Sequence, residues 1–298
     1  MPWDRFDPLA KGLLKKDGYY HKPYVIDAHT HIHLHIPKAG KPRFNNFHEV
    51  TEQLLREDQA AQIDPESLIM EMDRYGIDKA CVLYAGRMSI KFDDYIKVLR
   101  AYPDRFIGFY WPLDERKTDG LDKTPYTPER LAELTEEALS YSEIKGLGEG
   151  TAAEAAHWAE RKGWPSDDIT RFYMPMMEVA AEKKVPVMLH SGPSPYNITI
   201  TKETRKLFYR GYVGHANYDP MVYDGIVTLF PEINFILCHC GVQGSYFYNS
   251  YADHAMMLAA MHPNVYLETS MAPVELIEKA IADPAIGAEK LVMGSDFG

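Results

Sequence analysis

The sequence predicts a (β/α)8 barrel of the TIM-barrel class, and three observations lead to that prediction. Short apolar runs alternate with longer segments in which apolar residues recur every three or four positions, which is typical of strands followed by helices. Eight such runs occur in 298 residues, a length that suits one barrel. Residues suited to chemistry stand where several runs end, and barrel active sites lie at that end of the strands. An open, doubly wound sheet is the alternative architecture.

The predicted elements follow from these patterns in chain order. Strands are expected at residues 24–28, 80–84, 106–111, 144–148, 186–189, 234–238, 265–267 and 290–293. Helices are expected at residues 65–75, 93–101, 128–140, 169–183, 220–230, 245–261 and 274–282. A proline in the first turn, preceded by a residue that can cap the helix, supports three helix starts: Asp64-Pro65, Thr127-Pro128 and Asp219-Pro220.

Residues 1–23 are expected to form an N-terminal extension, and residues 24–298 a single barrel domain. Two connections after strands are long, residues 32–64 and 191–219, and such loops usually shape the mouth of a barrel site. The given sequence stops just after the eighth predicted strand, where a barrel usually continues into a closing helix. Either the given chain is truncated, or the N-terminal segment or a neighbouring subunit covers that seam. A homo-oligomer is expected, and an exposed seam gives a physical reason for it.

Composition and charge restrict the class of function. The formal net charge is −11, so binding of nucleic-acid phosphates through a basic face is not expected. The sequence has neither an apolar stretch typical of a transmembrane helix nor a signal-peptide pattern, so a cytoplasmic protein without membrane contact is expected. The three cysteines, Cys81, Cys238 and Cys240, are expected to be reduced thiols. A small molecule is the expected substrate.

The first candidate metal ligands are two histidines at the end of the first predicted strand, in the segment VIDAHTH. Side chains two positions apart on a strand point to the same side, so His29 and His31 project together and could bind one metal ion. His33 and His35 continue the alternation. A histidine-rich loop without a metal is therefore the alternative interpretation.

Three more strands end in residue types that bind Zn²⁺ or Mn²⁺. His190 ends VPVMLH, His239 comes within FILCHCG, and Asp296 follows LVMGS. Each could be structural alone, but four such ends at one rim favour a divalent-metal site, with zinc expected and manganese as the alternative. Alternation places His239 opposite to Cys238 and Cys240, so both thiols are expected to face the helices and not the metal.

Together these motifs resemble the amidohydrolase superfamily, and within it the amidohydrolase-related branch, amidohydrolase family 2. The resemblance rests on IDAHTHI, on the HxG after the sixth strand, on NVYLETS and on the terminal GSDF, and it spans about residues 24 to 298. It implies a metal-dependent enzyme. Because the branch contains hydrolases of lactones and related rings, hydratases and non-oxidative decarboxylases, the resemblance implies the family more strongly than the substrate.

The resemblance implies two alternative metal arrangements. With one metal, which is the commoner pattern in the branch and the expected one, four residues are ligands: His29, His31, His190 and Asp296. His239 is then an acid or base beside the bound water. With two metals, Glu149 at the end of the fourth strand bridges them, and His190 and His239 hold the second. Glu149 could instead contact the substrate, or it could support a metal ligand without binding the metal itself.

The resemblance also implies a reaction. In a hydrolase, a metal-activated water attacks the carbonyl carbon of a cyclic or carboxylate-bearing substrate, such as a lactone or an amide. Asp296 would accept the proton of that water, and His239 would polarise the carbonyl or protonate the leaving group.

Two other functions compete with hydrolysis. The first alternative is a metal-dependent decarboxylase of an aromatic or unsaturated acid. Decarboxylases of the branch tend to have His-Met-Gly-Glu where this chain has HCGV at residues 239–242, which favours hydrolysis. The lesser alternative is a barrel that has lost catalysis and serves as a binding or assembly subunit.

Four residues are candidate substrate contacts: Arg87, Trp111, Tyr196 and Arg210. The two arginines lie after the second strand and in the long loop after the fifth, where either could bind a carboxylate as a planar fork. The two aromatic residues could form walls around a cyclic substrate. Solvated arginines and aromatic packing are the alternative interpretations.

Overall fold

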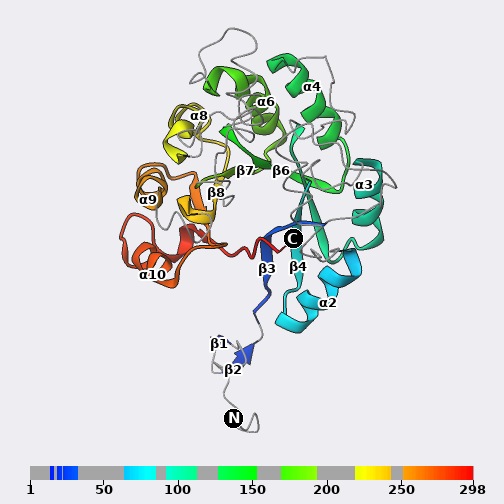
Figure 1. Ribbon diagram of the computed structural model, residues 1–298, viewed down its shortest axis with the longest axis vertical. Coiled ribbons are helices and arrows are strands. Elements are labelled where there is room, and N and C mark those ends of the chain that lie inside the picture. Colours follow the sequence, from blue (N-terminus) through cyan, green and yellow to red (C-terminus); the bar gives the residue numbers. More distant parts are fainter. Residues whose placement is uncertain are drawn as a thin grey trace, which may run out of the picture.

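The computed structural model describes most of the barrel and the helices around it (Figure 1). The described residues are 23–32, 64–84, 92–112, 127–152, 169–192, 219–242 and 251–297, together with the backbone of 14–16 and 19–21. The last two segments are strands β1 (Leu14–Lys16) and β2 (Tyr19–His21), which pair antiparallel. This hairpin stands apart from the barrel, before its first strand (Figure 1).

Eight strands form one parallel sheet. They are β3 (Ile26–Thr30), β4 (Lys79–Tyr84), β5 (Phe106–Tyr110), β6 (Ile144–Gly150), β7 (Val187–His190), β8 (Phe235–Cys238), β9 (Val265–Glu268) and β10 (Leu291–Val292). Each strand pairs with the next one in the chain, and every pairing is parallel. Because parallel neighbours share a direction, all the C-terminal strand ends lie on one face.

The chain after β10 closes the sheet onto β3. Ala28 N donates to Met293 O at 2.9 Å, Asp296 N to His29 O at 2.8 Å, and His31 N to Phe297 O at 2.8 Å. Thr30 and Phe297 form a parallel bridge. The eight strands therefore form a nearly closed barrel, and the predicted (β/α)8 class is confirmed.

Helices surround the barrel on its outside (Figure 1). They are α2 (Pro65–Tyr75), α3 (Phe92–Ala101), α4 (Pro128–Leu139), α6 (Ile169–Lys183), α8 (Asp224–Leu229), α9 (Ala252–Met261) and α10 (Val274–Ala282). The expected caps are present: Asp64 accepts from Ser67 N at 2.7 Å, and Thr127 accepts from Arg130 N at 3.1 Å. The helix expected at 220–230 divides into a 3-10 turn, η4 (Pro220–Tyr223), and α8. Of the helix expected at 245–261, residues 245–250 lie outside the described part.

Side chains alternate between two apolar regions. On β4, Ala80, Val82 and Tyr84 pack toward the helix layer, whereas Cys81 and Leu83 point into the barrel. The inside of the barrel is filled by a small cluster: Cys81, Leu83, Phe109, Met188 and Cys238. This cluster lies below the C-terminal strand ends, so the barrel has a packed interior, and the polar residues of the site lie at the strand ends.

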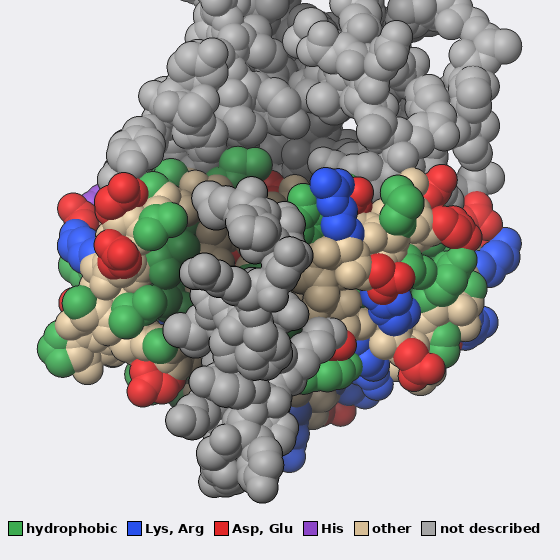
Figure 2. All heavy atoms as spheres, turned by 90° about the horizontal axis from the view of Figure 1, so that it is seen from below, with side chains coloured by type: hydrophobic (Ala, Val, Ile, Leu, Met, Phe, Trp, Pro, Cys, Tyr) green, Lys and Arg blue, Asp and Glu red, His purple; other side chains and the backbone are tan. Residues whose placement is uncertain are grey.

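The surface of the described part is mixed in character. On the face drawn in Figure 2, acidic and basic side chains of the described residues are interspersed among apolar ones, without one large basic area. None of the helices in the described segments has the length and apolarity needed to cross a membrane.

One buried side chain ties the strand layer to the segment that leads into β8. Asn264 Nδ2 donates to the carbonyl oxygens of Val227, Phe230 and Ile233 at 3.2, 3.1 and 3.0 Å.

Replacement of Asn264 by alanine leaves buried carbonyls without a donor, and each such group costs about 1–3 kcal/mol. We therefore expect Asn264→Ala to lower the free energy of unfolding by about 2–4 kcal/mol, measured by urea denaturation. The exposed Asn234→Ala is the matched control, and an equal loss in both variants would contradict this account.

Candidate functional site

Six of the predicted site residues meet at the C-terminal face of the barrel. His29 lies on β3 and His31 directly after it, Glu149 lies on β6, His190 ends β7, and His239 and Asp296 follow β8 and β10. The four histidines are buried, and the side chains of Glu149 and Asp296 are 14% and 15% exposed. The strand ends that the sequence singled out thus form one cluster that reaches the surface through its carboxylates.

His29, His31 and Asp296 form the first half of this cluster. His29 Nε2 and His31 Nε2 lie 3.2 Å apart, and Asp296 Oδ1 lies 3.3 Å from the former and 3.4 Å from the latter. Tetrahedral ligands at about 2.0–2.1 Å from an ion are separated by about 3.3 Å. The three atoms therefore fit the ligand spacing of a bound divalent cation such as zinc.

Glu149, His190 and His239 form the second half. Glu149 Oε1 lies 2.6 Å from His190 Nδ1 and 3.2 Å from His239 Nε2. The other oxygen, Oε2, lies 3.5 Å from His29 Nε2 in the first half. Three overlapping groups among the described residues could each hold a metal ion: His29–His31–Glu149, Glu149–His190–His239 and His29–His239–Glu268. Glu149 is the carboxylate that the first two groups share.

The carboxylates of the site are held in their ionised form. Burial raises the pKa of Glu149, but the charges of His190 and His29 outweigh it, and the pKa lies well below its usual range. Burial likewise raises the pKa of Asp296, yet the hydrogen bond with His31 and the nearby histidine charges lower it overall. Burial lowers the pKa of His29, but the charge of Glu149 raises it well above its usual value. Ionised carboxylates among imidazoles are a donor set suited to a divalent cation.

Two of these residues have unusual backbone conformations. His239 has φ 64° and Asp296 has φ 53°, the left-handed region that residues other than glycine rarely adopt. Such conformations persist only where surrounding contacts hold them, and they often occur at functional sites. His239 adopts this conformation directly after β8, and Asp296 adopts it in the segment that follows β10.

The conformation of His239 also explains why one of the two neighbouring cysteines does not face the helices as predicted. Cys240 packs in the helix-side core, as expected, and donates to Glu268 O at 3.2 Å. The prediction for Cys238 is wrong: its side chain points into the barrel and interacts with His29. Alternation ends at Cys238 because His239 leaves the strand in a left-handed conformation, so neighbouring side chains both face inward. Burial raises the pKa of both thiols well above the usual value, which makes them poor metal ligands.

Glycine at position 148 makes room where Glu149 enters the site. Gly148 has φ 139°, and a Cβ there would lie 2.5 Å from Met188 Cβ inside the barrel. The preceding Leu147 packs in the helix-side core. The pairing register between β6 and β7 shifts between Leu147 and Gly150, which allows Glu149 to point inward.

Three polar residues lie below the histidines and were not among the predicted site residues. Glu268 is completely buried and lies 2.9 Å from His29 Nδ1, while Ser270 Oγ lies 2.8 Å from His239 Nδ1. Asp27 Oδ1 accepts from His29 N at 3.0 Å. A signal for Glu268 was present, since it ends the apolar run VYL as Asp296 follows LVMGS.

The candidate substrate contacts are separate from this cluster. The structure places Trp111 in the helix-side core, completely buried, with its ring 5.4 Å from that of Tyr173. The proposed role of Trp111 as a substrate wall does not fit that position, because the strand-end indole packs outward. Arg87, Tyr196 and Arg210 lie outside the described residues.

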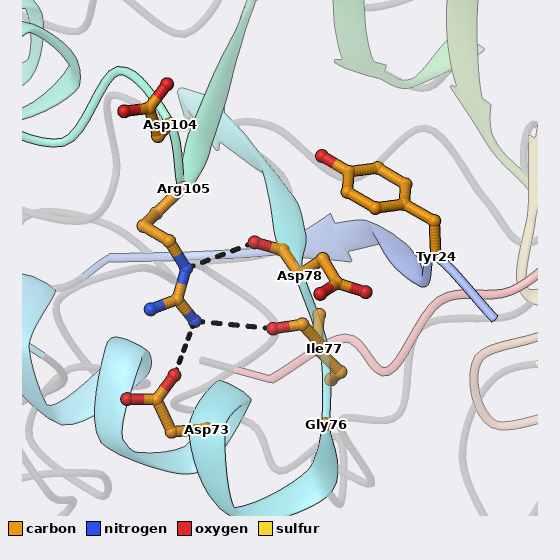
Figure 3. A pocket seen from close by; sticks show the side chains of 7 residues that line it. All are labelled: Tyr24, Asp73, Gly76, Ile77, Asp78, Asp104 and Arg105. Carbon is orange, nitrogen blue, oxygen red and sulfur yellow. Dashed lines mark hydrogen bonds and ion pairs between the residues drawn. The ribbon is translucent and has the colours of Figure 1, made fainter. Parts of the chain in front are cut away.

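A pocket of about 550 Å³ lies at the opposite end of the barrel, where β3, β4 and β5 begin (Figure 3). The Arg105 guanidinium donates there to Asp78 O, Ile77 O and Asp73 Oδ1, at 3.0, 3.3 and 2.8 Å. These bonds tie two loops together. This face of a barrel usually serves stability, so we assign the pocket no chemical role.

Comparison with known proteins gives a family match and structures of similar fold. The family model for Amidohydrolase matches residues 26–297. The chain is similar to a solved structure of 2,6-dihydroxybenzoate decarboxylase from Rhizobium, with 16% identity, 91% of this chain and 88% of that chain covered, and a TM-score of 0.53. It is also similar to 5-carboxyvanillate decarboxylase from Novosphingobium aromaticivorans complexed with manganese, with 16% identity, 92% and 86% coverage, and a TM-score of 0.51. No curated protein sequence matches it.

At these identities the solved structures bear on the fold alone. The family model covers nearly the whole barrel and includes every strand-end ligand candidate. The chain therefore belongs to the amidohydrolase family, in the family 2 branch that its motifs resemble.

Proposed function

We propose that this protein is a metal-dependent hydrolase that acts on a small carbonyl substrate, such as a lactone or an amide. The observation that carries the proposal is the position of Glu149, whose two oxygens face different halves of the site. A carboxylate between two groups of imidazoles suits a bridge between two cations. Sites with two metal ions about 3.5–4 Å apart are common in hydrolytic enzymes.

The donor set divides naturally between two ions. His29, His31 and Asp296 would hold one, His190 and His239 the other, and Glu149 would contact both. Divalent metal ions at such a site lower the pKa of a bound water and polarise a carbonyl oxygen. The geometry supports the two-metal alternative over a single ion, because Glu149 lies between His190 and His29.

Asp296 is the residue best placed to move the proton. Its side chain is 15% exposed, while the imidazoles behind it are buried, so it lies on the solvent side of the ligand group. Its lowered pKa keeps the carboxylate ionised. Asp296 can therefore accept a proton from the attacking water and pass it to the leaving group. His239 is assigned to binding in this arrangement and not to acid catalysis.

Decarboxylation of an aromatic or unsaturated acid is the second candidate function. The two similar structures described above are both decarboxylases, and one of them was solved with manganese and a nitrobenzoic acid. The same strand ends could bind a substrate carboxylate through the metal. The two candidates differ in their products, so they can be separated directly.

Metal content tests the proposed site. Protein purified without added metal is expected to contain about two equivalents of zinc or manganese by mass spectrometry of the metal ions. Glu149→Gln removes the shared negative charge and is expected to leave one equivalent or less. The control is Glu143→Gln, a glutamate paired with Arg100 away from the site. One equivalent in both the wild type and Glu149→Gln would favour the single-metal arrangement. No metal in the wild type, even after incubation with divalent ions, would remove the proposal.

Activity tests the reaction class. With excess divalent metal present, the wild type is expected to hydrolyse members of a panel of lactones and amides, and Asp296→Asn to lower kcat by at least about 100-fold. The matched control is Asp253→Asn, a surface aspartate paired with Lys279. Release of CO2 from aromatic acids, lost in Asp296→Asn and without any hydrolysis, would replace the hydrolase proposal by the decarboxylase.

A further inference from the structure

Glu268 is a buried carboxylate that touches both halves of the site from below. It ends β9 and is 0% exposed. Its Oε2 lies 2.9 Å from His29 Nδ1 and accepts from His239 N at 3.2 Å and from Ser270 Oγ at 2.7 Å. Its Oε1 accepts from Ser270 N. No part of this carboxylate is left to face a substrate, so its contacts are all with the protein.

The contact with His29 orients that ring. A carboxylate can only accept hydrogen bonds, so the proton between the two groups belongs to His29 Nδ1. A neutral imidazole protonated at Nδ1 has its lone pair on Nε2. His29 Nε2 is the atom that faces His31, Asp296 and Glu149. Glu268 thus presents the metal-binding atom of His29 to the first half of the site.

A second path leads from Glu268 to His239 through Ser270. Because Ser270 gives its only hydroxyl proton to Glu268 Oε2, its oxygen must accept in its contact with His239 Nδ1 at 2.8 Å. His239 is then also protonated at Nδ1, and its lone pair is on Nε2. That atom faces Glu149 Oε1 at 3.2 Å, in the second half of the site.

Packing holds Glu268 in this position. A Cβ on Gly294 would lie 2.2 Å from Glu268 Oε1 and 2.8 Å from His29 Cβ. The glycine of the GSDF segment therefore leaves only enough room for the carboxylate beside His29. With backbone donors on both oxygens and close contacts on one side, Glu268 cannot turn away from either histidine.

We infer that Glu268 is the positioning residue for both halves of the metal centre: it orients His29 directly and His239 through Ser270. The inference rests on the proposed metal-dependent function and adds to it a residue on the Nδ1 side of both histidines. Glu268 also belongs, with His29 and His239, to a third group that could hold an ion. The contacts of its oxygens with His29 Nδ1, His239 N and Ser270 favour the positioning role. Groups that hydrogen bond to metal-ligating histidines typically change metal affinity by about 10–100-fold when they are removed. A single side chain behind both halves should therefore affect both ions, whereas Ser270 should affect only the one held by His239.

The experiment measures metal affinity instead of turnover. Metal-free wild type, Glu268→Gln, Ser270→Ala and the control Glu143→Gln are titrated with Co²⁺, followed by the visible absorption of the bound ion and by calorimetry. Glu268→Gln is expected to weaken both binding steps by about 10–100-fold, and Ser270→Ala only one of them. Thermal unfolding of each metal-free variant shows whether it is folded. If Glu268→Gln does not fold, Ser270→Ala alone decides, through selective loss of one step.

Each outcome supports or overturns the inference. Wild-type affinities in folded Glu268→Gln, or in Ser270→Ala, would overturn it while leaving the proposed function intact. A wild-type protein that binds no Co²⁺ would overturn the proposed function as well. Nitrogen NMR of the zinc-loaded protein gives an independent check, because His29 and His239 should both carry their ring proton on Nδ1. A proton on Nε2 of either ring would contradict the inference.

Discussion

The hydrogen bonds that join the chain after β10 to β3 determine the arrangement of the site. Backbone bonds from Asp296 N to His29 O and from His31 N to Phe297 O place the aspartate beside both histidines. Asp27 strengthens the junction, since its buried Oδ1 accepts from His29 N and from Ser295 N, each at 3.0 Å. Asp296 meets the histidines only while the barrel is closed. The bonds that close the barrel therefore also bring these three ligand candidates together.

Electrostatics explains why the cluster suits cations. Glu149, Glu268 and Asp296 each have a pKa below the usual value despite burial, because histidines surround them. Ionised carboxylates without partners are costly in a buried place. Burial lowers the pKa of His29, but the charge of Glu149 raises it overall, so positive charge is favoured beside these carboxylates. A divalent cation would supply such charge, and ions that bind histidine ligands usually displace a proton.

The barrel and the placement of four ligand candidates at one rim could be predicted, because apolar runs with a polar last residue follow directly from strand alternation and burial. Other features depend on contacts that a linear pattern does not contain. Cys238 was misplaced because the left-handed turn at His239 ends the alternation. Glu149 lies in the glycine-rich run GLGEG, where alternation carries little information, and its inward direction depends on a register shift. Glu268 ends an apolar run as the ligand candidates do, but its role below the histidines depends on its hydrogen bonds to His29 and Ser270, which the run does not contain.

The proposed metal centre depends on Glu149 joining the two halves of the site at one barrel rim. The most direct measurement is anomalous X-ray diffraction from crystals grown with zinc or manganese, recorded on both sides of the absorption edge of the metal. Two anomalous peaks are expected, one among His29, His31 and Asp296 and one beside His190 and His239, with an oxygen of Glu149 in contact with each. A single peak without Glu149 as a ligand, or no peak at this rim, would contradict it.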